Sequence, residues 1–199
     1  MLSRYRDNLR VWTDPVGHLL FRLHLRPNHL TVGGLGVSVL TAVAFGAARL
    51  RLAAALLVLA GLFDYFDGSL ARASGQVTPF GGFLDSVIDR YSDLVVLLGI
   101  VMLFVSVGSG RGVLVTMAAL VGTVMVSYTK ARAESIGVAC NVGFMERPER
   151  MICMIAGAAF DLLEPAMWVL AVLANATAVQ RIVFTRRAAR AIEPSVMVD

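Results

Sequence analysis

The sequence predicts an all-α polytopic membrane protein, with six transmembrane helices preceded by an interfacial amphipathic helix. Of its 199 residues, 57% are hydrophobic and 16% are charged, against about 25% charged in a typical soluble domain. Long apolar runs recur from about Leu30 to Phe184, and the mean hydropathy is +0.73. Because a bilayer crossing takes about 20 apolar residues, this length allows about six helices and no separate soluble domain.

Residues 1–26 are expected to form the amphipathic helix. Apolar residues recur there at three- and four-residue spacing: Leu9, Trp12, Val16, Leu19 and Leu23. Arginines flank or oppose this stripe: Arg4, Arg6, Arg10, Arg22 and Arg26. A helix of this kind lies in the membrane interface with its basic side toward anionic headgroups, although packing on the protein's own surface is an equally good interpretation.

The six transmembrane helices follow within residues 27–190, and residues 191–199 form a C-terminal tail. Pro27 breaks the chain, and Asn28 and Thr31 are natural helix-start residues. The expected spans are 30–49, 51–72, 80–107, 112–134, 148–163 and 165–184. The third span is long because its first half is expected to project toward the cytoplasm.

The basic residues predict the orientation. With the N-terminus inside, the cytoplasmic segments hold 14 of the 18 lysines and arginines, and the outer connections hold only Arg49, Arg51 and Arg111. This asymmetry places both termini on the cytoplasmic side of the cell membrane. Nucleic acid is excluded as a partner, because no basic run is interleaved with base-stacking aromatic residues. The two cysteines and three histidines have no spacing typical of a disulfide framework or a zinc site.

Five aspartates fall within the second and third expected spans, where an unpaired charge costs at least about 2.5–3.5 kcal/mol. At 100° per residue, one face of span 51–72 carries Asp64, Asp67, Gly68, Ala71 and Arg72. One face of span 80–107 carries Gly81, Asp85, Asp89 and Asp93. A short connection makes the two helices antiparallel neighbours, so the carboxylates are expected to converge near the cytoplasmic end.

Clustered carboxylate oxygens suit Mg²⁺ or Mn²⁺, and a divalent ion would offset their mutual repulsion. Gly68 and Gly81 leave backbone room for a ligand, and Arg72 supplies a planar donor fork for phosphate. Two other interpretations are weighed. Buried helix–helix ion pairs would have only Arg72 and Arg90 to match five aspartates. A cation or proton transporter would use the carboxylates as a relay, but it explains neither the glycines nor Arg72.

Residues 64–89 read DYFDGSLARASGQVTPFGGFLDSVID. They match the CDP-alcohol phosphotransferase signature D-x-x-D-G-x-x-A-R-x(8)-G-x-x-x-D-x-x-x-D at each of its fixed positions: Asp64, Asp67, Gly68, Ala71, Arg72, Gly81, Asp85 and Asp89. The sequence therefore resembles this family, which also has an interfacial helix and six transmembrane helices. The resemblance implies a membrane enzyme that transfers a lipid-linked phosphate from a CDP-lipid to a polar acceptor and releases CMP.

The resemblance also implies roles for individual residues. Two Mg²⁺ or Mn²⁺ ions would bind Asp64, Asp67, Asp85 and Asp89, and Asp89 would serve as the general base. The CDP-lipid would be contacted by Asn28, His29, Leu30, Thr31, Gly68, Arg72, Thr78 and Gly81. Asp93 lies outside the signature and is expected to have a supporting role at most. The resemblance further implies a homodimer, because this is the usual oligomeric state in the family.

Three further segments resemble prokaryotic phosphatidylinositol phosphate synthases and their archaeal archaetidylinositol counterparts: residues 127–134, 144–150 and 179–181. This resemblance implies that Lys130, Arg150 and Arg181 bind the phosphate of myo-inositol phosphate, with Arg132 and Arg147 nearby. Three alternatives stay open: basic loops that only set topology, glycerol 3-phosphate as the acceptor, and an intramembrane prenyltransferase, which would not release CMP. The donor is CDP-diacylglycerol or a related CDP-lipid, and an archaeal ether lipid is not distinguished from it.

Overall fold

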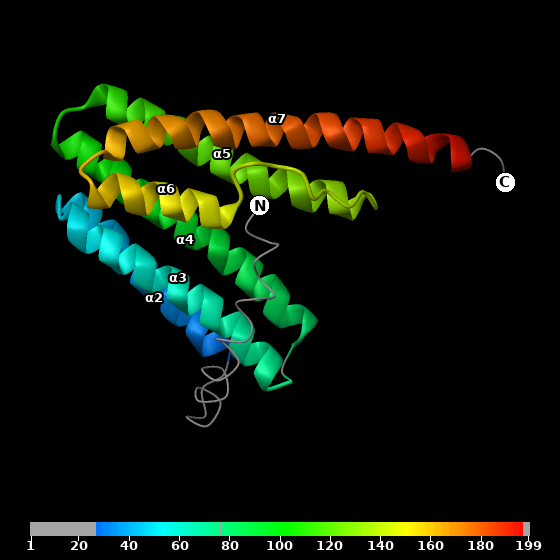
Figure 1. Ribbon diagram of the computed structural model, residues 1–199, viewed down its shortest axis with the longest axis horizontal. Coiled ribbons are helices and arrows are strands. Elements are labelled where there is room, and N and C mark those ends of the chain that lie inside the picture. Colours follow the sequence, from blue (N-terminus) through cyan, green and yellow to red (C-terminus); the bar gives the residue numbers. More distant parts are fainter. Residues whose placement is uncertain (1–26, 76, 197–199) are drawn as a thin grey trace.

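A computed structural model describes residues 27–75 and 77–196, apart from the side chains of residues 73 and 191–196. The expected amphipathic helix at 1–26 and the last three residues of the expected tail lie outside this range. Within it, every regular element is an α-helix (Figure 1). The helices are α2 (Pro27–Gly46), α3 (Leu50–Ala73), α4 (Pro79–Ser106), α5 (Gly110–Ser135), α6 (Arg147–Ala159) and α7 (Leu163–Val196).

The helix starts agree with the sequence prediction, and two helix ends do not: α6 stops at Ala159, four residues before its predicted end, and α7 is longer than predicted. Each helix begins within three residues of its predicted span. However, α7 continues to Val196, whereas its predicted span ended at residue 184. The apolar run stops near Phe184, but the arginines and alanines that follow are good helix formers, so the helix continues into the segment assigned to the tail.

The membrane character of the chain is supported by three of these helices. α2, α5 and the stretch Leu163–Arg190 of α7 are long and apolar enough to cross a bilayer. α3 and α4 are also long, with 24 and 28 residues, but they carry the aspartates, and α6 has only 13 residues. Six crossings therefore stay a prediction.

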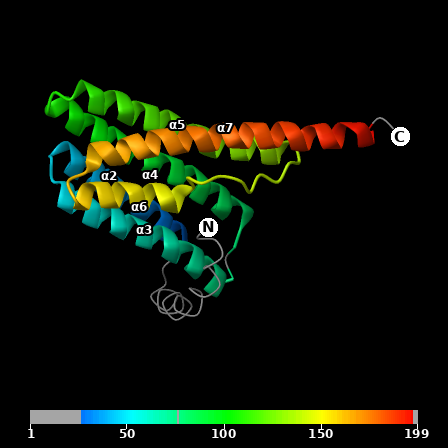
Figure 2. The same cartoon turned by 45° about the horizontal axis from the view of Figure 1, so that its top comes forward.

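The helices pack as two groups that share α4. α2 packs against both α3 and α4, α5 packs against α4 and α7, and α6 contacts α3 and α7. Figures 1 and 2 show α7 running past the end of the bundle, while α2 and α3 diverge from it. Close helix contacts depend on small residues: a Cβ atom on Gly99 of α4 would lie 2.5 Å from the backbone of Ala42 in α2.

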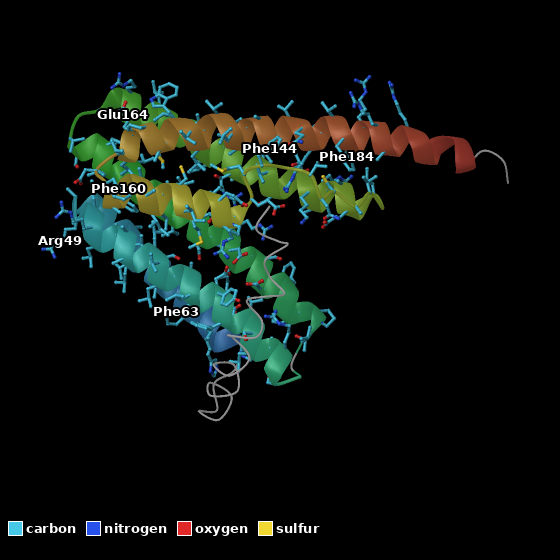
Figure 3. All side chains as sticks on the ribbon, viewed as in Figure 1. Arg49, Phe63, Phe144, Phe160, Glu164 and Phe184 are labelled. Atoms are coloured by element: carbon cyan, nitrogen blue, oxygen red, sulfur yellow. The ribbon has the colours of Figure 1, made fainter. Side chains whose placement is uncertain are left out.

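One end of the bundle gathers the α2–α3, α4–α5 and α6–α7 connections. Arg51 lies 3.9 Å from Asp161, and Arg111 lies 2.5 Å from Glu164. Figure 3 shows Glu164 together with Arg49 and Phe160 at this end. The aspartate-bearing ends of α3 and α4 therefore point toward the opposite end of the bundle.

The extended part of α7 is covered by the connection between α5 and α6. Ala133, Val138 and Cys140 form a small buried cluster, against which Phe184 and Ala188 pack. This second apolar cluster explains why α7 stays helical beyond the predicted span. It also explains Cys140, whose thiol side chain is fully buried.

Candidate functional site

Three carboxylates from two antiparallel helices converge as the sequence predicts. Asp64 and Asp67 lie in the C-terminal half of α3, and Asp85 lies in the second turn of α4. One carboxylate oxygen from each lies within 4.8 Å of the others. The helical period puts the aspartates on one side of each helix. The two helices were predicted to be direct neighbours, but α2 packs against both of them, and this packing brings the two acidic faces together.

The cluster fits a hard divalent cation. The Asp85 carboxylate has one buried oxygen, Oδ1, with no hydrogen-bond partner among the described residues. Leaving a buried acceptor unpaired is unfavourable, and a cation held between the carboxylates would supply the missing partner. All the donors are oxygens, which Mg²⁺ and Mn²⁺ prefer.

Asp89 lies one turn after Asp85 and reaches the cluster through an arginine. Nη1 of Arg147, at the start of α6, lies 2.5 Å from Asp89 Oδ1 and also contacts Asp64 Oδ1. Asp64, Asp67, Asp89 and Arg147 line one small pocket together with residues of α2, α3 and α4: Thr31, Gly34, Leu35, Ser38, Ala60, Ile88 and Ser92. The pocket therefore joins three of the four predicted metal ligands, including the predicted base Asp89, with one predicted acceptor residue; Asp85 is not among the residues that line it.

The start of α2, which was predicted to contact the CDP-lipid, also lies at this site. Thr31 Oγ1 donates a 2.7 Å hydrogen bond to Asp67 Oδ2, and both residues are buried. Leu30 is buried beside Thr31, whereas His29 and Asn28 are exposed. The hydroxyl of Thr31 therefore fixes one oxygen of a predicted metal ligand.

The two signature glycines lie beneath side chains that were predicted to contact the nucleotide. A Cβ atom on Gly68 would lie 3.3 Å from Nη1 of Arg72, whose side chain is exposed. A Cβ on Gly81 would lie 3.0 Å from Oγ1 of Thr78 and 3.9 Å from Oδ1 of Asn28. Thr78 is also the N-cap of α4, because its hydroxyl oxygen accepts a 3.0 Å hydrogen bond from Gly81 N.

Arg150 forms a buried ion pair one turn beyond the predicted base. Its Nη2 atom lies 2.6 Å from Asp93 Oδ2, and the two side chains are only 4% and 7% exposed. Arg147 Nε is 3.8 Å from the other oxygen of Asp93. Asp93, for which only a supporting role was expected, is thus the counter-ion of Arg150 and also lies near Arg147.

Arg181 holds the segment that leads into α6. Its guanidinium donates to the carbonyl oxygens of Val142 at 2.8 Å and Val126 at 2.6 Å, and it lies 3.4 Å from Glu146 Oε1. With 2% of the residue exposed, Arg181 is almost fully buried. The sequence analysis missed Glu146; a buried arginine requires a counter-charge, but the sequence does not identify which acid supplies it.

Segment 142–146 links the arginines of α6 and α7. The carbonyl oxygen of Met145 accepts from Arg150 at 3.4 Å, and its amide donates to Thr177 Oγ1 of α7 at 3.2 Å. Gly143 has a φ of +139°. A Cβ atom there would lie 2.7 Å from Thr177 Cγ2, so both the backbone conformation and the close approach require glycine.

The two basic residues at the end of α5 lie further out. Lys130 is one turn after Val126, whose carbonyl binds Arg181, and its ammonium lies 4.0 Å from Glu134. Arg132 is exposed and donates to Ser135 Oγ at 3.2 Å. The structure therefore brings Arg147, Arg150 and Arg181 to one buried region, with Lys130 at its edge and Arg132 turned to its own helix.

A helical membrane protein with clustered carboxylates beside several arginines is equipped to bind a cation together with phosphate groups. Comparison with known protein families gives the class: a model of the CDP-alcohol phosphatidyltransferases matches residues 24–183. The chain therefore belongs to the CDP-alcohol phosphatidyltransferase family. It is a phosphotransferase of phospholipid biosynthesis, as the signature predicted.

Two kinds of relatives stand out. The chain is 38% identical over 190 residues to the archaetidylinositol phosphate synthase of Methanothermobacter thermautotrophicus, covering 92% of this chain and 93% of that protein. It is 35% identical over 198 residues to the phosphatidylinositol phosphate synthase of Mycobacteroides abscessus, covering 94% and 90%.

The fold also agrees with solved structures. The phosphatidylinositol phosphate synthase of Mycobacterium tuberculosis with CDP-DAG bound has a TM-score of 0.80 and 36% identity, covering 87% of this chain and 92% of that one. The same enzyme in complex with manganese and citrate also has a TM-score of 0.80, with 35% identity and coverage of 87% and 88%.

Proposed function

We propose that this enzyme transfers a phosphatidyl or similar phospholipid group from a CDP-lipid to myo-inositol phosphate, giving phosphatidylinositol phosphate and CMP. The proposed acceptor rests on the similarity of this chain, over nearly its whole length, to synthases named for inositol-phosphate lipids. A solved relative with CDP-DAG bound supports the donor class.

The metal site would be formed by Asp64, Asp67, Asp85 and Asp89, with two Mg²⁺ or Mn²⁺ ions. The convergence of three of these carboxylates supports it, as does the manganese complex of the mycobacterial relative. When bound, the ions would neutralise the diphosphate and make CMP a better leaving group.

The chain's own residues would hold the nucleotide at the start of α2 and the α3–α4 turn. Arg72 is exposed above Gly68, where its planar fork can meet phosphate oxygens. Asn28 and Thr78 both lie near Gly81, so they can contact the same ligand.

The acceptor phosphate would bind beside the α6 arginines. The Nε atoms of Arg147 and Arg150 are buried without a hydrogen-bond partner among the described residues. Buried donors of this kind are stabilised by an anion that accepts from them. Arg181 shapes the same region through segment 142–146, and Lys130 and Arg132 would contribute from the end of α5.

Asp89 would act as the general base. It shares a pocket with Arg147, so an acceptor whose phosphate is held at the α6 arginines can place a hydroxyl near its carboxylate. Asp89 would take that proton as the oxygen attacks the lipid-linked phosphorus and the bond to CMP breaks. Direct attack requires no covalent enzyme intermediate.

The proposal places this reaction on the cytoplasmic side of the cell membrane, with both termini inside and two copies forming a homodimer. The location rests on the 14-to-3 distribution of basic residues between the two sides. Cysteine accessibility labelling at Arg132→Cys and Arg111→Cys should give opposite sidedness.

The test is CMP release from CDP-diacylglycerol, and from its ether-lipid equivalent, by the purified enzyme with inositol phosphate, glycerol 3-phosphate or free inositol. Inositol phosphate should be used well, glycerol 3-phosphate poorly and free inositol hardly at all. Faster turnover with glycerol 3-phosphate would overturn the acceptor while leaving the family unchanged.

A further inference from the structure

Arg147 occupies an unexpected position for a residue predicted to bind the acceptor phosphate. Its Nη1 atom contacts Oδ1 of Asp64 on α3 and lies 2.5 Å from Oδ1 of Asp89 on α4. Its side chain is 19% exposed and lines the pocket that both carboxylates line. One guanidinium nitrogen therefore bridges two carboxylates that are expected to bind metal.

We propose that Arg147 is a resident counter-ion of Asp64 and Asp89 that a divalent cation displaces, so that metal binding frees its guanidinium for the acceptor phosphate. This inference rests on the metal site and acceptor of the proposed function. In this role Arg147 couples metal binding to acceptor binding, whereas the proposed function treats it only as one more ligand of the acceptor phosphate.

The competition follows from the shared oxygens. A carboxylate oxygen that is bound by a guanidinium at hydrogen-bond distance presents that lone pair to Arg147 and not to an ion. A divalent ion bound by Asp64 and Asp89 would also lie within a few ångströms of a full positive charge, and such like charges repel. Retaining both cations on the same two oxygens is therefore unfavourable.

The structure also provides a place for the displaced side chain. Arg147 Nε already lies 3.8 Å from Asp93 Oδ1, while the other oxygen of Asp93 binds Arg150. Arg147 is the first residue of α6, so its side chain can turn away from Asp64 and Asp89 without moving the helix. The guanidinium would then lie beside Arg150, where the acceptor phosphate is proposed to bind.

The experiment measures Mn²⁺ affinity in detergent micelles, by electron paramagnetic resonance of free Mn²⁺, without any substrate. Arg147→Gln should bind Mn²⁺ at least about tenfold more tightly than the wild type, because a competing charge-assisted contact is lost. Arg147→Lys, which keeps the charge, should stay within about threefold of the wild type.

Arg90→Gln is the matched control. Arg90 is also near Asp89, at 4.0 Å, but its side chain is 44% exposed and its Nη1 donates to the carbonyl of Ser86 on its own helix. Its removal should change Mn²⁺ affinity by less than about threefold, because exposed charges are screened by solvent. An equal gain in Arg90→Gln would overturn the specific role of Arg147.

The remaining outcomes are also decisive. Arg147→Gln is purified with Mn²⁺ throughout, because the ion should replace the missing counter-charge; a variant that cannot be recovered even then overturns the proposal. Equal Mn²⁺ affinity in wild type and Arg147→Gln overturns this inference alone. If neither protein binds Mn²⁺, the proposed metal-dependent function fails, and this inference fails with it.

Discussion

Asp93 offers the sharpest test of how the site is held together. Its carboxylate lies 2.6 Å from Arg150 Nη2, and neither side chain is more than 7% exposed. Asp93→Asn keeps the shape but leaves a buried guanidinium without its counter-charge. Removing one partner of such a buried pair costs about 3–5 kcal/mol, so the free energy of unfolding should fall by that amount.

A double-mutant cycle separates the interaction free energy of Asp93 and Arg150 from the effects of each substitution on its other neighbours. Arg150→Met removes the charge while keeping an apolar stem of similar length, and Asp93→Asn with Arg150→Met should cost less than the two single changes added together. A coupling free energy of about 2–3 kcal/mol is expected, at the upper end of values for residues in direct contact. The assay is reversible unfolding in mixed detergent micelles, with helix content as the readout.

The control cycle uses Lys130 and Glu134, which lie 4.0 Å apart at an i,i+4 spacing with side chains 37% and 50% exposed. Their coupling should be about 0.3–0.5 kcal/mol, because water screens an exposed pair. Additive effects in the Asp93–Arg150 cycle, or a coupling no larger than this control, would refute the reasoning from burial.

Four further changes test the chemistry and the fold. Asp89→Asn should lower turnover by about 10²–10⁴ while leaving much of the CDP-lipid affinity, as measured by CMP release and lipid binding, since it removes the proposed base. EDTA should stop activity, and added Mg²⁺ or Mn²⁺ should restore it, because the ligand set consists of carboxylates. Arg181→Ala should raise the acceptor's KM about tenfold or more in steady-state assays, with little change in the CDP-lipid's KM, because segment 142–146, which leads into Arg147 and Arg150, loses its contact with Arg181. Gly143→Ala should reduce stability by more than about 1 kcal/mol in the same unfolding assay, because its φ is +139° and the new Cβ would meet Thr177.

Each of these four has a clear contrary result. Turnover within about tenfold of the wild type would exclude Asp89 as the base. Full activity in chelator, with metal-free protein confirmed by elemental analysis, would exclude the metal. An unchanged acceptor KM would remove Arg181 from the acceptor site, and an unchanged unfolding free energy would show that segment 142–146 can shift to accommodate Gly143→Ala.

The sequence alone determined the helix starts and the carboxylate cluster. Both depend on local rules: apolar runs of bilayer length and the 100° step that puts Asp64 and Asp67 on one face. The connection between α3 and α4 is only a few residues long, and both helices pack against α2, so the two acidic faces lie close together. The convergence of Asp85 with the α3 aspartates was predicted from these local rules and the structure confirms it, although the packing of both helices on α2 could not be read from them.

Tertiary structure alone decided which arginine meets which carboxylate. Arg147 contacts Asp64 from 83 residues away, and Arg150 contacts Asp93 from 57 residues away. Arg181 reaches the α5 backbone rather than an open phosphate pocket. In the sequence these arginines look alike, because every basic residue near the cytoplasmic end of a helix satisfies the positive-inside rule.

The physical reason is that helical periodicity fixes a residue's direction around its own axis, whereas ion-pair partners depend on how helices pack. The packing of α6 between α3 and α7 is set by side-chain shape over the whole interface. The length of α7 depends on both: its last residues are good helix formers, and the small apolar cluster around Cys140, which covers the helix as far as Ala188, comes from a loop and two helices far apart in the chain. Local patterns thus established what the acidic site is made of, and packing decided which charges balance it.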